Sequence, residues 1–156
     1  MNNEDIENTR FYYQHHVVDK LSQAKFNLNL ENRISIFNMS SETFLIHNAK
    51  SISSVLRSIH QLSASKHINI LHALKTGLLA LKHRPETNQR MRIILCIGSS
   101  TRLSQEEQEQ IMLISKQIKR QKIGLDIINI GIESTLIGFY ENFINACNGP
   151  DELWYF

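Results

Sequence analysis

The sequence predicts an α/β protein in which helices flank a mostly parallel sheet. Two continuous apolar runs, residues 92–98 (RIILCIG) and 123–131 (IGLDIINIG), are typical of strands buried on both faces. A helical pattern follows each run, and this alternation of strand and helix favours parallel pairing. The length of 156 residues suits one core and is too short for two ordinary ones, so we expect a single domain over residues 1–156.

The N-terminal half predicts a helix, a hairpin and two further helices. The first helix is indicated by apolar residues that recur three and four positions apart: Val17, Leu21, Ala24 and Leu28. Residues 31–39 and 43–48 alternate in polarity across a polar link, which predicts a hairpin. Two apolar stripes at helical spacing follow: Ile52, Val55, Leu56, Ile59 and Leu62, then Leu71, Leu74, Leu78 and Leu81. Pro85 ends the second of these helices.

Strands and helices alternate in the C-terminal half. Ser104 and Glu107 have the spacing of a capping box, which predicts a helix after the first buried strand. Its inner face carries Ile111, Ile114 and Ile118. A last helix follows the second buried strand, with apolar positions Leu136, Phe139, Tyr140, Phe143 and Cys147. Residues 148–150 (NGP) end that helix, and residues 152–156 (ELWYF) are candidates for an edge strand.

Composition excludes several classes of function. A formal net charge of +2 gives no electrostatic reason to expect nucleic acid or an anionic membrane as a partner. No apolar run approaches the roughly 18 residues of a membrane span, so we expect a soluble intracellular protein. Cys96 and Cys147 lie in apolar segments and are predicted to be free thiols rather than a disulfide.

No catalytic, cofactor or metal site emerges from the residues. The loop Gly98–Thr101 follows a buried strand, where α/β sheets bind ligands, but it lacks a glycine-rich fingerprint and a phosphate-loop lysine. The histidines are scattered and have no cysteine or carboxylate partners at ligand spacing. Asp126 interrupts a buried strand and is interpreted as paired with backbone or a lysine. We therefore expect a binding or assembly role rather than an enzyme.

A basic cluster ends the helix that the capping box begins. Its members are Lys116, Lys119, Arg120 and Lys122. Cations are favourable at a helix C-terminus, and no aromatic residues interleave with them as in nucleic-acid sites. We interpret the cluster as a solvated cap and expect no nucleic acid as partner.

Several short motifs, in order, resemble a known family. Residues 79–84 (LALKHR), a polar link and residues 91–94 (MRII) are similar to the most distinctive stretch of the proteasomal von Willebrand A family. Gly98-Ser99 follows at the family's spacing, residues 126–131 (DIINIG) match its next strand, and Asn148-Gly149 match its helix exit. The resemblance covers about the whole chain.

The resemblance implies a three-layer, Rossmann-like von Willebrand factor A fold and a scaffold role without a reaction. Family members pack between the lid and base of the proteasome regulatory particle, in cytoplasm and nucleus, so lid and base subunits are the expected partners. A related alternative is a von Willebrand A docking subunit of a transcription and DNA-repair complex, although such subunits continue into cysteine-rich zinc motifs. A nucleotide-binding α/β enzyme is a third alternative, and it would need a glycine-rich loop after its first strand.

The sequence departs from the family in two respects. It stops just past the A domain, and residues 78–81 (LLAL) lack the acidic cluster of a ubiquitin-interacting motif, which argues against direct ubiquitin binding. The family's first central strand and its metal-binding Asp loop would lie before Met1, and His72 stands at the position resembling a threonine ligand. We therefore expect no metal ion, and we expect that an upstream start or another chain supplies the central strand.

Two segments are candidates for the protein interface. Lys82, His83 and Arg84 close a helix just before Pro85, and Ser99 and Ser100 crown the sheet. The alternative interpretation of the same residues is that they are helix-end charges and turn residues.

Overall fold

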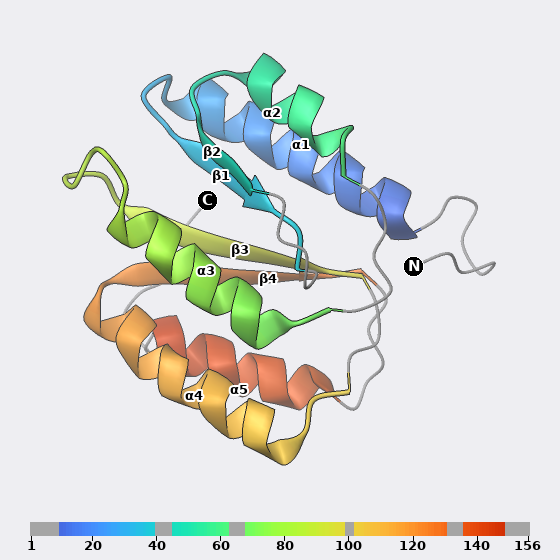
Figure 1. Cartoon of the computed structure of the whole chain (residues 1–156), viewed down its shortest axis with the longest axis vertical. Helices are drawn as coiled ribbons and strands as arrows, with labels where there is room; N and C mark the ends of the chain where they lie inside the picture. The colour runs from blue at the N-terminus through green and yellow to red at the C-terminus, as the bar shows by residue number, and fades with distance from the viewer. Residues whose placement is uncertain (1–9, 40–44, 63–67, 99–101, 131–135, 149–156) are drawn as a thin grey trace. The chain divides into compact units, whose positions relative to one another are not determined.

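A computed structural model describes residues 10–39, 45–62, 68–98, 102–130 and 136–148 (Figure 1). Its contacts divide the chain into two compact units, Met1–Thr76 and Gly77–Phe156, which we describe separately. The predicted order of helices, hairpin and alternating strands is confirmed within these ranges. The edge strand expected at residues 152–156 lies outside the described residues.

The first unit is built from a helix, a hairpin and a short second helix. Its elements are α1 (Arg10–Leu28), β1 (Ile34–Phe37), β2 (Leu45–Ala49) and α2 (Ile52–Ile59). β1 and β2 pair antiparallel, as predicted, with Ile36 opposite Ile46. A buried cluster of Phe26, Ala49, Val55 and Ile59 forms the core between these elements.

Helix α2 is shorter than its apolar stripe predicts. Leu62 continues the stripe, but the helix ends at Ile59 and the following amides bond three residues back. Gln61 N–H donates to Ser58 O, and Leu62 N–H donates to Ile59 O, both at 3.1 Å. Such tightening at a helix exit satisfies carbonyls that have no partner in a regular α-helix. The apolar stripe therefore continues to Leu62, beyond the last residue of α2.

Helix α3 (Ile70–Lys82) crosses from the first unit into the second. Asn69 begins it: the side-chain oxygen of Asn69 accepts a hydrogen bond from His72 N–H at 2.8 Å, as an N-cap does. The backbone N–H of Asn69 also donates to Met39 O at 2.8 Å, which ties the start of α3 to the residues that follow β1. Leu74 and Leu78 on its inner face are buried, as predicted.

The second unit contains the parallel strands and two long helices. Its remaining elements are β3 (Met91–Ile97), α4 (Gln105–Arg120), β4 (Ile123–Asn129) and α5 (Ile137–Asn148). β3 and β4 pair in parallel from Met91↔Ile123 to Ile97↔Asn129. Helices α4 and α5 pack on each other and on β4 (Figure 1). The predicted capping box of Ser104 and Glu107 is present at the start of α4.

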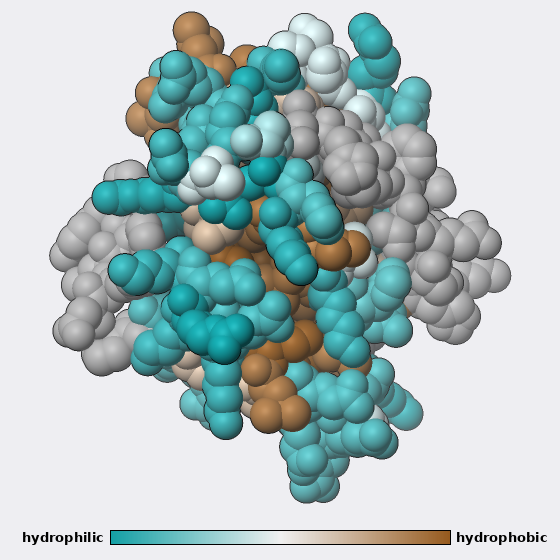
Figure 2. Space-filling model, turned by 60° about the vertical axis from the view of Figure 1, so that its left-hand side comes forward, coloured by the Kyte–Doolittle hydropathy of each residue, from teal (hydrophilic) through white to brown (hydrophobic). Residues whose placement is uncertain are grey.

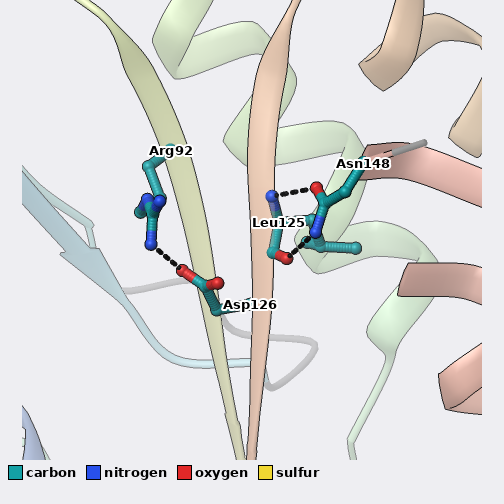
Figure 3. Close-up of polar contacts among 4 residues, drawn as sticks. All are labelled: Arg92, Leu125, Asp126 and Asn148. Carbon is teal, nitrogen blue, oxygen red and sulfur yellow. Dashed lines mark hydrogen bonds and ion pairs between the residues drawn. The ribbon is translucent and has the colours of Figure 1, made fainter. Parts of the chain in front are cut away.

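β3 is fully buried on one face only, and β4 is buried from Ile123 to Leu125 but half-buried or exposed beyond, which corrects the expectation of burial on both faces of each strand. Along β3, Ile93, Leu95 and Ile97 are buried, while the residues between them are half-buried. The physical reason is charge: Arg92 of β3 and Asp126 of β4 form an ion pair at 2.7 Å on the half-buried face (Figure 3). An ion pair keeps more of its hydration on a partly exposed face, where the desolvation cost is smaller.

The two cysteines are free, as predicted. Burial raises the pKa of the Cys96 thiol to about 11 and that of the Cys147 thiol to about 12. Both thiols are therefore protonated and inert near neutral pH.

Candidate functional site

Basic residues from three segments of the second unit lie at one end of the parallel strands. We call this set the basic end, and its members are Lys82, His83, Arg84, Arg90, Lys119, Arg120 and Lys122. Parallel pairing explains the convergence, because Met91 lies opposite Ile123 and the residues just before both strands share one end. Helix α4 ends two residues before Lys122, and α3 leads through residues 83–90 into β3. In Figure 1 this end lies on the left.

Most of the basic end is exposed to solvent. Lys82, Lys119 and Lys122 are exposed, and Arg84 is half-buried. Figure 2 brings the side that carries this end toward the viewer and shows hydrophilic side chains over much of that side. Among the described residues of this unit, the acidic ones near it are Glu86, in the connecting loop, and Asp126, which is paired with Arg92. The described residues of this surface therefore carry a local positive charge that the net charge of the chain, +2, does not reveal.

Arg84 has a structural role as well as a charge. Its guanidinium donates from Nη1 to Leu81 O at 2.8 Å and from Nη2 to Thr87 O at 3.0 Å. These bonds close the exit of α3 onto the loop that precedes β3. Among the three predicted interface residues of this segment, Lys82 and His83 are exposed, and Arg84 bonds the helix end that carries them to the loop that follows.

The other predicted interface residues, Ser99 and Ser100, lie outside the described residues. Gly98, the last described residue before them, follows the far end of β3 from Met91. The structure therefore does not bring the Gly98 end and the Lys82–Arg84 segment into one surface.

Asp126, the carboxylate that stands out in the sequence, pairs with a strand neighbour. Its partner is Arg92, not the backbone or a lysine, and their side chains are 25% and 20% exposed. Arg92 lies opposite Gly124 and Asp126 lies opposite Ile94, so the pair joins β3 to β4 diagonally (Figure 3). This geometry gives the charged residue inside an apolar strand a structural role.

The described residues contain no group of three His, Cys, Asp or Glu side chains that is placed to hold a metal ion. None of the described helices is long and apolar enough to cross a membrane.

Sequence reasoning recognised the Lys82–Arg84 segment and the basic cluster of α4 separately and missed their convergence. Arg90 was missed altogether. The signal that brings them together is topological: residues that precede two parallel neighbouring strands lie at one end of the sheet.

Comparison with known proteins defines the class to which this fold and surface belong. Residues 1–101 match the family model of the von Willebrand factor type A domain, so the chain belongs to that family. A crystal structure of the SpRpn10 VWA domain superimposes with a TM-score of 0.82 at 27% identity, covering 97% of this chain and 77% of that one. The predicted von Willebrand factor A fold is confirmed.

The relatives are regulatory subunits of the proteasome. The chain is 29% identical to the 26S proteasome non-ATPase regulatory subunit 4 of Schistosoma mansoni, over 97% of this chain and 35% of the relative. It is 32% identical to the homolog of that subunit in Arabidopsis thaliana, over 84% of this chain and 34% of the relative. It is also 29% identical to the 26S proteasome regulatory subunit RPN10 of Saccharomyces cerevisiae, over 96% of this chain and 56% of the relative. The chain thus spans between about a third and a little over half of these relatives.

Proposed function

We propose that the chain is a non-catalytic scaffold subunit of the proteasome regulatory particle that bridges lid and base in ubiquitin-dependent protein degradation. The observation that carries the proposal is similarity over nearly the whole chain to proteasome regulatory subunits from animals, plants and fungi. The described residues add support, because their one conspicuous carboxylate is paired and their cysteines are protonated. Such a subunit works in cytoplasm and nucleus.

Ubiquitin recognition is not part of the proposed role of this segment. The Leu78–Leu81 sequence superficially resembles a ubiquitin-interacting helix, whose apolar residues must be available to ubiquitin. Leu78 is only 6% exposed and packs in the core, while Leu79 is 56% exposed. Of these four residues only Leu79 presents a largely exposed apolar side chain, which is a small apolar surface for a partner.

The alternative, a docking subunit of a transcription and DNA-repair complex, has less support. The relatives named above carry proteasome names. No observation on the described residues favours the alternative.

The test is co-purification of the tagged chain from its native source, followed by identification of lid and base subunits. We expect both sets of subunits with the wild-type chain. The double variant Lys82→Glu/His83→Glu should recover several-fold less of them, because both side chains are exposed on the basic end and the change lowers its positive charge.

The control is Lys20→Glu, which reverses a single charge at an exposed lysine of α1 in the first unit. Recovery with the control should equal that of wild type. Recovery of repair-complex subunits, or of no stable partner, would contradict the proposed function. Equal recovery of lid and base subunits with the wild-type chain, the double variant and the control would show that Lys82 and His83 are not part of the interface. Arg84 is avoided here because its reversal would also open the loop that it holds.

A further inference from the structure

Lys122 occupies a backbone conformation that lysine rarely adopts. Its φ of 54° is the one positive value at a non-glycine position among the described residues. The residue directly follows Gln121, the C-cap of α4, where helices commonly exit through glycine. Glycine is preferred there because it has no Cβ to clash with the neighbouring carbonyl. The chain therefore holds a lysine where glycine would fit without strain.

The backbone of Lys122 does not explain the lysine. Its N–H donates to Lys119 O at 3.0 Å, a bond that glycine would make equally well. The negative end of the α4 dipole is already opposed by Lys119 and Arg120 in the last turn. What lysine alone adds at this position is an exposed positive charge between the end of α4 and the start of β4. Strained residues that persist in a fold are candidates for function.

We propose that the basic end, centred on Lys122, binds an acidic, Asp- and Glu-rich segment of a partner protein. The proposal deepens the scaffold function proposed above, because it names the chemistry of a docking partner. Local charge carries it: Lys82, Lys119 and Lys122 are exposed at one end of the two strands, where the described residues hold more basic than acidic side chains. Charge complementarity steers association and selects partners.

An acidic protein segment fits this surface better than nucleic acid does. No Phe, Tyr or Trp occurs in residues 82–92 or 116–124, so the segments that form the basic end offer none of these rings for stacking of bases. The Nη1 and Nη2 atoms of Arg84 each donate to a backbone carbonyl, so they do not offer a phosphate the paired donors that a guanidinium can provide. Exposed lysines are suited to flexible carboxylates, which need a positive field more than a fixed geometry.

The test measures binding of a fluorescein-labelled dodecapeptide of alternating Glu and Asp to the chain by fluorescence anisotropy. The comparison ligands are the Gln and Asn version of the peptide and a single-stranded thymidine dodecanucleotide. We expect the acidic peptide to bind more tightly than either. Its affinity should fall roughly tenfold between about 50 and about 300 mM salt, because exposed charges are screened.

Lys122→Gly is the informative variant, since it removes the charge and relieves the strained backbone together. We expect its affinity for the acidic peptide to fall roughly two- to fivefold, the scale of one exposed charge pair. Its melting temperature should equal or exceed that of wild type, which separates the effect from unfolding. Lys20→Gln, at an exposed lysine of α1, should change neither quantity.

Equal binding of the uncharged peptide, tighter binding of the oligonucleotide, absence of binding, or unchanged affinity of Lys122→Gly would each overturn the proposal. These outcomes are distinguishable from failure of the scaffold function. A chain that co-purifies with lid and base yet ignores the peptide refutes only the acidic-segment proposal. A chain that binds the peptide but joins no regulatory particle refutes the scaffold function.

Discussion

His15 shows how a single residue responds to its neighbours in the first unit. The ring of Phe11 lies 4.1 Å from the imidazole of His15, centroid to centroid. The Nε2 atom of His15 is buried and has no hydrogen-bond partner among the described residues. Burial first, and then the positive charge of His60, lower the pKa of His15 below its ordinary value of 6.5. Protonation of His15 therefore costs more in the folded chain than in the unfolded one.

The sign of the resulting pH dependence follows from linkage. Above about pH 6.5 the histidine is neutral in both states and makes no difference. Below that pH the unfolded chain binds the proton more readily, so the free energy of unfolding should decrease as the pH falls toward the lowered folded-state pKa. Urea unfolding between about pH 7 and about pH 5 would measure this. His15→Gln should flatten the slope, whereas His83→Gln, at an exposed histidine, should leave it unchanged. An identical slope in His15→Gln would disprove the assignment.

At the scale of elements, Asn148 fastens the end of α5 to β4. Its side-chain amide donates to Leu125 O and accepts from Leu125 N–H, each at 2.9 Å (Figure 3). Leu125 is 1% exposed, so neither of its backbone groups has water as an alternative partner. The side-chain amide of Asn148 thus bonds the N–H and C=O of Leu125, as the backbone of a neighbouring strand would.

Asn148→Ala should destabilise the chain by about 2–6 kcal/mol, because it leaves two buried backbone groups unpaired at about 1–3 kcal/mol each. Asn148→Asp should be at least as severe near neutral pH, since a carboxylate cannot donate to Leu125 O. Asn145→Ala is the matched control, as Asn145 is exposed on the same helix and should change stability by less than about 0.5 kcal/mol. Urea unfolding of the three variants measures the difference. A loss of stability in Asn145→Ala equal to that in Asn148→Ala would show that the clamp is not the cause.

These elements also show which features a sequence reveals. The capping box of Ser104 and Glu107 was predictable because both of its bonds close within one turn. The Asn148 clamp was not, since its partner lies 23 residues away and the same asparagine serves equally well as a helix exit. The Arg92–Asp126 pair, 34 residues apart, likewise depends on the register of two strands. Local bonding is readable from spacing, whereas contacts between elements require the topology.

The candidate surface repeats this lesson at the scale of the molecule. Lys82–Arg84 could be proposed from the sequence because these residues end a helix beside Pro85. Their association with Arg90 and Lys122 depends on the pairing of Met91 with Ile123, which no local pattern specifies. The strain at Lys122 is equally invisible in the sequence, since its φ follows from how α4 meets β4.

The prediction of a single domain over residues 1–156 can be tested through the two thiols. Contacts divide the chain at Thr76 and Gly77, and both cysteines belong to the second unit. At about pH 8 the raised pKa values of Cys96 and Cys147 keep them protonated, so alkylation reports unfolding of that unit. Far-UV circular dichroism reports helices of both units. If the chain folds as one cooperative domain, thiol labelling and circular dichroism should share one urea midpoint. A labelling midpoint displaced from the circular-dichroism midpoint, or a dichroism curve with two steps, would show instead that the units unfold separately. In an all-or-none transition every site shares one free energy of unfolding. If the units unfold together, strain or binding at the basic end therefore alters the stability of the first unit as well as the second.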